Sequence, residues 1–363
     1  MKIAFVHPKL RDYRLELFDE LNKRYDITFI FTDDFPDNIL KTPSKWNYKN
    51  IGGIIWHLKL IRELLKSKYD IILTSTRYRP CFLLAKLTGK KLIFWTEYWY
   101  WDNDTVIKRL RNLFSKFMAR HTDALIATGT QSYEFNLSIG VSKEKMFTYP
   151  QCAVDYSNTS NTKDLRKELQ LQNKKVILYL SRITPLKGLD YLIKAFALLE
   201  KKMDNVCLLV VGDGPFRKDC ENLVKELGVK NVLFMGSVDE DDNTTKAFYY
   251  KACDVFVLPT IILNGVDCWG LVINEAMAFG KPIVTTDAVG AVPDMVKDGY
   301  NGYVVKNKNV QELFGALYKI LSNPELAKVM GKNSREIFEE KNVYGKMIKK
   351  FIDVIEYVKK GKQ

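Results

Sequence analysis

Short runs of apolar residues recur along the whole chain, separated by amphipathic stretches. In the first half these runs lie at 2–7, 26–32, 70–75, 91–97 and 124–129. In the second half they lie at 175–181, 206–213, 232–236, 255–259, 282–287 and 302–305. Within each run the hydrophobicity is continuous rather than alternating, which indicates strands that are covered on both faces. The pattern therefore predicts parallel sheets.

Segments with helical spacing separate these strands, for example at 11–23, 105–120, 188–201, 215–227 and 308–321. Regular strand–helix alternation predicts doubly wound α/β sheets, and 363 residues are too many for one ordinary core. The polar stretch 155–164 is the best linker candidate. We therefore expect two Rossmann-like domains, 1–160 and 161–342, facing across a cleft, and a helix at 343–363 that packs back on the first. Ligands should bind where strands end.

Composition removes several classes of protein. The chain has no uncharged apolar run of about 18 residues, so no membrane span is expected. Charges follow too soon after the first residue for a secretory signal. Six scattered cysteines without a CxxC pair favour reduced thiols in a cytoplasm, and three histidines argue against a His-based zinc site. We expect a cytoplasmic protein without a metal.

The net charge of +13 lies mostly in the first half, which holds 25 Lys and Arg against 16 Asp and Glu up to residue 150. The remainder holds 31 against 27. This imbalance favours an acidic partner such as a phosphate-bearing ligand, an anionic membrane face or a nucleic acid. Solubility alone explains the same excess about as well.

The stretch "DCWGLVINEAMAFGKP" (267–282) places two acids, Asp267 and Glu275, in an apolar segment. A helix is expected to begin near Gly270, where the backbone is open to a ligand, and the amides from Gly270 to Leu271 and Val272 would attract an anion. A diphosphate bound there would have a carboxylate on each side to accept hydrogen bonds from sugar hydroxyls. A helix cap at Asp267 and a surface salt bridge at Glu275 would also explain the pair.

Two further loops follow strands of the second half. In "RITPLKG" the cations Arg182 and Lys187 would neutralise a diphosphate and stabilise it as a leaving group, although they also fit solvated loop cations. In "VVGDGPF" (210–216) the glycines Gly212 and Gly214 precede a helix, but the third glycine of a dinucleotide-binding motif is missing.

Residues 175–305 resemble, in order and spacing, the retaining family-4 glycosyltransferases of the GT-B fold. The resemblance runs through "SRITPLKGLDYLIKAFALL", "LLVVGDGPFRKD", "CDVFVLPT" and the stretch that begins at Asp267. It implies that Glu275 holds the ribose, that Asp267 lies by the donor sugar, and that Arg182 and Lys187 grip the diphosphate. Asp267 is one methylene shorter than the Glu usual in the family, which would suit a different donor sugar.

In that family the acceptor binds the N-terminal domain. The stretch "HPKLRDYRLELF" resembles members in which a Tyr-Arg pair opens the first helix, so His7, Tyr13 and Arg14 are acceptor-side candidates. In "FWTEYWYWDND", Glu97 is a candidate for orienting an acceptor hydroxyl, and Tyr98 for stacking on a sugar. A plain helix start and core packing by Trp95 are the alternatives.

The segment 104–121 is a basic amphipathic helix with no acid between 105 and 122. This pattern suits an anionic membrane surface, or equally a helix packed on its own sheet. Just before it, Asp102-Asn103-Asp104 fits the DxD metal motif formally, but N-capping of the helix explains it better.

The combined expectation is a retaining glycosyltransferase of polysaccharide or glycolipid biosynthesis, without cofactor or metal. It would move a sugar from a UDP- or GDP-sugar to a hydroxyl of a glycan, lipid-linked or small-molecule acceptor. No nucleic acid is expected, and peripheral contact of 104–121 with the inner face of the membrane stays open. Two alternatives stay open: a nucleotide-sugar epimerase of the same fold, and a non-catalytic basic protein that binds nucleic acid or membrane.

Overall fold

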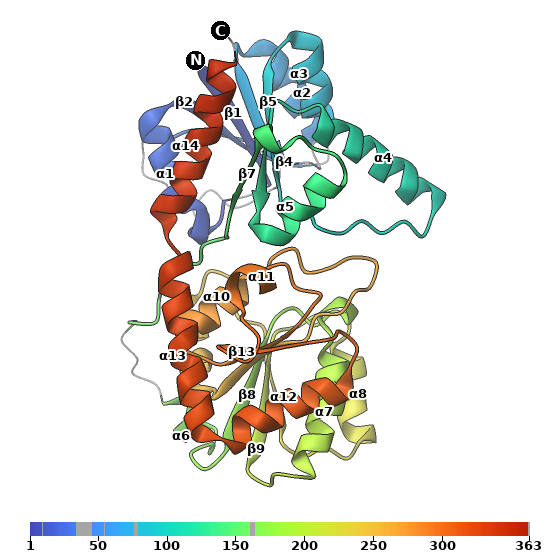
Figure 1. The fold of residues 1–363 in the computed structure, drawn as a ribbon, viewed down its shortest axis with the longest axis vertical. Coiled ribbons are helices and arrows are strands. Elements are labelled where there is room, and N and C mark those ends of the chain that lie inside the picture. The colour runs from blue at the N-terminus through green and yellow to red at the C-terminus, as the bar shows by residue number, and fades with distance from the viewer. Residues whose placement is uncertain (9, 34–45, 54, 76–78, 160–163, 362–363) are drawn as a thin grey trace. The chain divides into compact units, whose positions relative to one another are not determined.

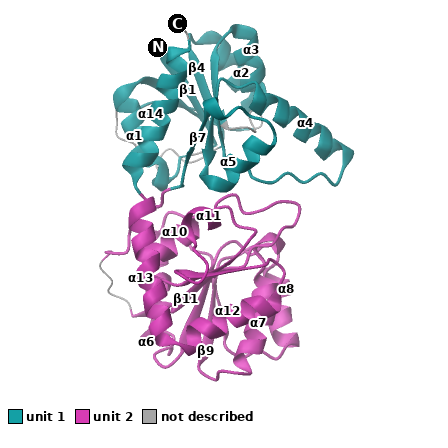
Figure 2. Ribbon diagram, in the orientation of Figure 1, with its two compact units in different colours: residues 1–151, 343–363 teal, residues 152–342 magenta. Residues whose placement is uncertain are grey.

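The computed structural model describes residues 1–8, 10–33, 46–53, 55–75, 79–159 and 164–361. The chain forms two compact units, shown in different colours in Figure 2. Unit 1 comprises Met1–Gln151 and Val343–Gln363, and unit 2 comprises Cys152–Asn342. The predicted boundary at 160/161 lies later in the chain than this division. Residues 160–163 of the predicted linker lie outside the described residues, whereas Tyr156 is buried in the core of unit 2.

Unit 1 is built on a seven-stranded sheet with the order β3-β2-β1-β4-β5-β6-β7, in which all neighbours are parallel. Its strands are β1 (Lys2–His7), β2 (Asp26–Phe31), β3 (Asn47–Asn50), β4 (Ile71–Ser75), β5 (Lys91–Thr96), β6 (Ala124–Thr128) and β7 (Met146–Tyr149). The five predicted strands are all present. β3 and β7 were not predicted, because β3 is a fully exposed polar edge strand and β7 is only four residues long.

Helices flank this sheet (Figure 1). They are η1 (Asp12–Arg14), α1 (Leu15–Arg24), α2 (Trp56–Lys66), α3 (Arg79–Thr88), α4 (Val106–Arg120), α5 (Gly129–Ser138), η3 (Lys143–Lys145) and α14 (Tyr344–Lys360). The last of these, α14, packs on α1 and on β5, β6 and β7. Its Phe351 is fully buried against the rings of Phe5, Trp95 and Tyr149. The end of the chain thus completes the core of unit 1.

Unit 2 has a six-stranded parallel sheet with the order β10-β9-β8-β11-β12-β13. Its strands are β8 (Lys175–Leu180), β9 (Val206–Val211), β10 (Val232–Gly236), β11 (Val255–Leu258), β12 (Ile283–Thr286) and β13 (Gly302–Val305). Its helices are α6 (Leu165–Glu168), η4 (Pro185–Lys187), α7 (Leu189–Glu200), α8 (Arg217–Glu226), α9 (Asn243–Ala252), α10 (Leu271–Ala278), α11 (Val292–Met295), α12 (Val310–Ser322) and α13 (Pro324–Lys341). All six strands lie where the apolar runs predicted them.

The sheet of unit 2 is buried on both faces. Alternate residues of β8 enter different apolar clusters: Val176 and Leu178 lie in one, and Ile177 and Tyr179 in the other. Successive side chains of a strand point to opposite faces, so the continuous apolar run reflects two buried faces. This confirms the predicted fold class of Rossmann-like parallel sheets in both units.

The strand order also shows where a ligand should bind. In unit 2 the chain leaves β8 toward β9 on one side and later returns to β11 on the other. At such a reversal the loops after the two central strands diverge and leave a crevice at their carboxyl ends. The corresponding strands of unit 1 are β1 and β4. Among the described residues, no helix is long and apolar enough to cross a bilayer.

Candidate functional site

The loops after β8 and β11 meet at the strand-order reversal of unit 2. Lys187, the last residue of η4, forms an ion pair with Asp267 from the loop after β11. Gly188 lets the loops approach: its φ is 66°, and a Cβ there would lie 2.0 Å from the carbonyl oxygen of Pro259. The structure therefore brings together two of the predicted donor-binding residues, which are 80 positions apart in the sequence.

The backbone of Asp267 is fixed from the other side by the loop after β12. Its amide donates to the carbonyl of Ala288 at 3.2 Å, and its own carbonyl accepts from the amide of Gly290 at 2.9 Å. Asp267 is therefore not the cap of the following helix. The N-cap is Gly270, with φ 86° and ψ 57°, and α10 begins at Leu271.

The start of α10 lies beside this ion pair. A Cβ on Gly270 would be 3.7 Å from Oδ2 of Asp267, so the carboxylate lies close to the cap. The first amides of a helix have no acceptor inside it and carry the positive end of its dipole. The amides of Leu271 and Val272 are the first of α10, and they offer an anion two donors near the Lys187 ammonium.

Glu275 lies one turn further along α10 and is buried, with 6% of the residue exposed. Its Oε1 accepts a hydrogen bond from Nζ of Lys246 at 2.7 Å, and its Oε2 accepts one from the hydroxyl of Tyr250 at 2.8 Å. Burial, and then the charge of Glu275, raise the pKa of Tyr250 well above its usual value, so this hydroxyl remains a donor. The alternative of a surface salt bridge at Glu275 is wrong, because the pair is buried.

Sequence reasoning missed Lys246 and Tyr250. Both lie on α9, one turn apart, so they share one face of that helix. The available signal for Lys246 was its position on the face of α9 that carries the buried residues. Which carboxylate it would meet depended on how α9 packs against α10.

The remaining donor-side candidates flank the same loops. The carbonyl of Arg182 accepts from the hydroxyl of Tyr179 at 3.0 Å, which fixes the backbone, while its own side chain is exposed and makes no ion pair within the described part of the chain. Gly212 and Gly214 follow β9 and pack against the backbone carbonyls of Ser181 and Ile183, where a Cβ would clash. The loops after β8 and β9 are therefore in direct contact.

In unit 1 the acceptor-side candidates gather around Trp95. Arg14 is 5% exposed, its Nη2 donates to Oε1 of Glu97 at 2.9 Å, and its guanidinium lies 3.9 Å from the centre of the Trp95 ring. Burial would lower the pKa of Arg14, but its interactions with Tyr13, Glu97 and Tyr149 outweigh burial and raise the pKa. The guanidinium therefore stays charged and fixed.

The other first-half candidates are placed differently. His7 ends β1, is buried, and its ring centre lies 5.4 Å from that of Trp95. Tyr13 lies beside the Arg14 guanidinium, and its carbonyl accepts from the hydroxyl of Tyr344 at the start of α14. Tyr98 is an exposed side chain in the loop after β5. Trp95 itself is core packing, as the alternative had it, and Glu97 lies at the edge of that core.

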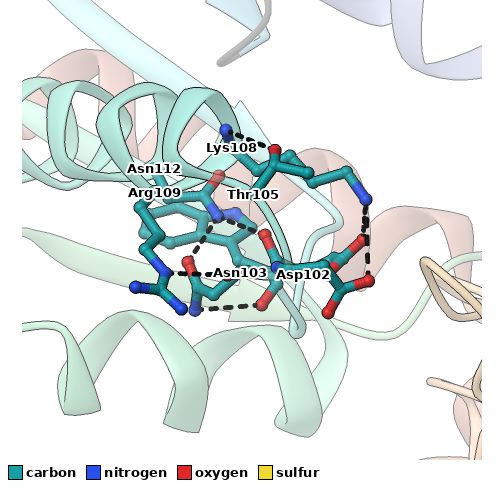
Figure 3. A network of polar contacts seen from close by, with 8 residues as sticks. Asp102, Asn103, Thr105, Lys108, Arg109 and Asn112 are labelled. Carbon is teal, nitrogen blue, oxygen red and sulfur yellow. Dashed lines mark hydrogen bonds and ion pairs between the residues drawn. The ribbon is translucent and has the colours of Figure 1, made fainter.

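The segment Asp102-Asn103-Asp104 before α4 forms polar contacts with the first turns of that helix (Figure 3). The cap is Thr105, whose hydroxyl oxygen accepts from the amide of Lys108 at 3.2 Å, and Asp102 forms an ion pair with the Lys108 side chain. Nδ2 of Asn112 donates to the carbonyl of Asp102 at 2.7 Å and to Oδ1 of Asn103 at 3.0 Å. The expectation that Asp102-Asn103-Asp104 caps the helix is therefore wrong, because Thr105 is the cap; the segment instead contacts the first turns of α4 through Lys108 and Asn112. The described residues hold no group of three or more His, Cys, Asp or Glu arranged to bind a metal ion.

Comparison with known proteins identifies relatives of this chain. The family model "Glycosyl transferases group 1" matches residues 161–337. A Haemophilus influenzae protein described as an uncharacterized glycosyltransferase is 31% identical over 286 residues, which cover 78% of this chain and 75% of that protein. A GDP-mannose-dependent alpha-(1-6)-phosphatidylinositol monomannoside mannosyltransferase of Mycobacterium tuberculosis is 30% identical over 177 residues, covering 48% of this chain and 45% of the relative.

The fold has close structural counterparts. The crystal structure of Anabaena HepE in complex with UDP superposes with a TM-score of 0.80 and 20% identity, covering 98% of this chain and all of that one. At 20% identity this similarity establishes only the fold. The H. influenzae relative, which is similar over most of both chains, establishes the family. The chain belongs to the group 1 glycosyltransferases and has their GT-B fold.

Proposed function

We propose that this glycosyltransferase is a retaining family-4 enzyme that moves a sugar from a UDP- or GDP-sugar to an acceptor hydroxyl. The observation that carries the proposal is the meeting of Lys187, Asp267 and the start of α10 at the strand-order reversal of unit 2. The HepE structure contains UDP, and the mycobacterial relative is named for its dependence on GDP-mannose. Both support a nucleotide diphosphate as the donor's leaving group.

Each group at this crevice has a role in the proposal. Lys187, Arg182 and the first amides of α10 neutralise the diphosphate. An ammonium has three donors, so Lys187 can bind a phosphate oxygen while it remains paired with Asp267. Glu275 accepts hydrogen bonds from the ribose hydroxyls, and Asp267 lies by the donor sugar.

The chemistry then rests on position and charge. Cations and helix amides aimed at the leaving diphosphate stabilise the negative charge that develops as the sugar–phosphate bond breaks. In the proposed front-face route the departing diphosphate takes the proton of the acceptor hydroxyl, and the new bond forms on the same face of the sugar. The fixed groups of unit 2 would supply orientation, without a resident metal or cofactor.

The acceptor is proposed to bind unit 1. Glu97 is exposed enough to accept a hydrogen bond from an acceptor hydroxyl, and Arg14 holds it in place. His7, Tyr13 and Tyr98 are the further candidates for acceptor contact. A glycan, a lipid-linked sugar and a small molecule are the proposed acceptor classes.

Contact with an anionic membrane belongs to the same proposal. α4 exposes apolar side chains along one side, with Ile107 79% exposed. The exposed members are Val106, Ile107, Leu110, Leu113 and Phe117. Arg109 and Arg111 are exposed on the same helix, and no acid lies between 105 and 122. An apolar face bordered by cations is typical of helices that lie on anionic lipid, which would bring the enzyme to a lipid-linked acceptor.

Nucleotide binding tests the central claim. We expect UDP, GDP or one of their sugars to raise the melting temperature, because a ligand at about 100 times its Kd adds roughly 2.7 kcal/mol of stability. Lys187→Ala should lose most of this shift and all sugar transfer. Lys194→Ala, which removes a half-exposed lysine on α7 whose pair with Asp190 spans 3.7 Å, is the matched control and should bind normally.

The stereochemistry of the product tests the retaining mechanism. With a donor identified by binding, the anomeric configuration of the product can be read by NMR, and we expect that of the donor. An inverted product would refute retention, and equal nucleotide binding by the wild type and Lys187→Ala would refute the site.

A further inference from the structure

Lys246 is a buried lysine with no direct role in the proposed binding of the donor. It is 6% exposed, and its Nζ lies 2.7 Å from Oε1 of Glu275. Lysine is almost never fully buried unless it is paired, and a buried pair adds little stability compared with apolar side chains of similar size. The presence of this pair beside the proposed ribose-binding carboxylate therefore points to a role in recognition.

The Glu275 carboxylate retains acceptor capacity beyond its hydrogen bonds inside unit 2. An ionised carboxylate can accept at about four lone-pair positions, two on each oxygen. Lys246 takes one position on Oε1, and Tyr250 takes one on Oε2. The buried hydroxyl of Tyr156 also lies near the carboxylate, and burial followed by the charge of Glu275 raises the pKa of Tyr156. At least one acceptor position is therefore left for the ribose hydroxyls.

Aromatic rings fix this arrangement. Nζ of Lys246 lies 5.1 Å from the centre of the Tyr156 ring, and Tyr250 stacks on Phe279 with ring centres 5.3 Å apart. Tyr156 and Phe279 also meet edge to face. All these groups belong to unit 2, so the carboxylate cannot turn without losing a hydrogen bond inside a packed cluster.

We infer that Lys246 is a positioning residue that, together with Tyr250, orients the Glu275 carboxylate so that its remaining acceptor capacity faces the ribose hydroxyls of the donor. The inference rests on the proposed function, because it assumes that Glu275 meets the ribose. It adds that ribose recognition depends on a lysine that never touches the nucleotide.

A thermodynamic cycle tests this coupling. UDP and GDP are compared with their dideoxy counterparts, which lack both ribose hydroxyls, by calorimetric titration. For the wild type we expect the dideoxy nucleotide to bind roughly 10- to 100-fold more weakly, the loss that accompanies hydrogen bonds to a charged group. In Lys246→Met this discrimination should fall to within about threefold. A lysine with only a structural role would weaken both nucleotides equally and leave their ratio unchanged.

Three variants control the measurement. Lys251→Met removes a lysine of the same helix that donates to the carbonyl of Thr159 instead, and it should keep the wild-type ratio. Lys246→Arg keeps a cation and should restore most of the discrimination. Tyr250→Phe keeps the packing and removes one donor, so it should lose part of the discrimination even if Lys246→Met fails to fold.

Two outcomes separate the claims. If the wild type binds neither UDP nor GDP, the proposed function fails. If the wild type discriminates against the dideoxy nucleotide and both Lys246→Met and Tyr250→Phe keep the full ratio, the inference alone is overturned. Absence of discrimination in the wild type would overturn both the ribose role of Glu275 and the inference.

Discussion

Glu275 and Lys246 compensate each other's charge inside unit 2. A substitution of Glu275 therefore changes the stability of the protein as well as its activity. A carboxylate on the surface can be removed at little cost. Here the pair is buried, with both side chains 8% exposed, and removing one partner leaves the other charged, desolvated and without its hydrogen bond. Loss of activity in a Glu275 variant is therefore informative only if stability is measured beside it.

We expect Glu275→Ala to lose about 3–5 kcal/mol of folding free energy, the usual cost of breaking a buried ion pair from one side. Glu275→Gln should lose less, because its amide oxygen can still accept from Lys246. Urea denaturation of both variants checks this, and both should lose sugar transfer. Glu226→Ala, at the exposed end of α8, is the control. A Glu275→Ala protein as stable as the wild type would contradict the buried pair.

Individual residues were predictable where a motif is local in the sequence. Asp267, Gly270 and Glu275 lie within nine residues of one another, so their order alone placed them around a helix start. Pairs such as Arg14 and Glu97, 83 residues apart, were named as separate candidates and could not be joined. Lys246 was missed because its burial exists only once α9 packs against α10.

At the scale of elements, continuous apolar runs sufficed to locate the central strands, because a strand covered on both faces has no polar side. The same signal fails at an edge. All four residues of β3 are exposed, so nothing in its composition distinguishes it from a loop.

For α4 the sequence predicted an amphipathic helix but did not show which of its faces packs against the rest of unit 1. The structure buries Asn112, Met118 and Ala119 and leaves Leu110, Leu113 and Phe117 exposed.

This exposed face predicts binding to anionic vesicles. The wild type should sediment with vesicles of phosphatidylcholine and phosphatidylglycerol, and weakly or not at all with phosphatidylcholine alone, because the helix carries cations and no acid. Replacing Ile107 and Leu110 together by Ser should weaken binding about tenfold or more, since each apolar side chain moved into lipid contributes roughly 1.5–3 kcal/mol.

The control for the vesicle experiment is Val329→Ser, an exposed apolar residue on α13 in unit 2, which should sediment like the wild type. High salt should reduce the binding, because surface charges are screened. Equal binding to neutral and anionic vesicles, or no effect of the double substitution, would contradict membrane contact through α4.

At the scale of the whole molecule, the chain closes the core of unit 1 with its last helix. Residues 1–151 form the sheet, the chain then passes through all of unit 2, and α14 returns to cover β5, β6 and β7. Phe351, Val354 and Ile355 are fully buried there. Unit 1 therefore cannot complete its core before the segment after residue 342 is available, whereas unit 2 is one continuous stretch of chain.

Phe351 is the residue at which this dependence can be tested. Its ring contacts Phe5, Trp95 and Tyr149, all in unit 1, so Phe351→Ala should cost unit 1 about 3–5 kcal/mol. Hydrogen exchange should then speed up at the amides of β5 and β6, while the amides of β8 and β11 keep their protection. Binding of UDP or GDP should be unchanged, because the proposed nucleotide site lies within unit 2. Tyr357→Ala, on the same helix but 41% exposed, should leave both units protected. Equal loss of protection in the two units, or weakened nucleotide binding in the Phe351 variant, would show that α14 supports more than the core it touches.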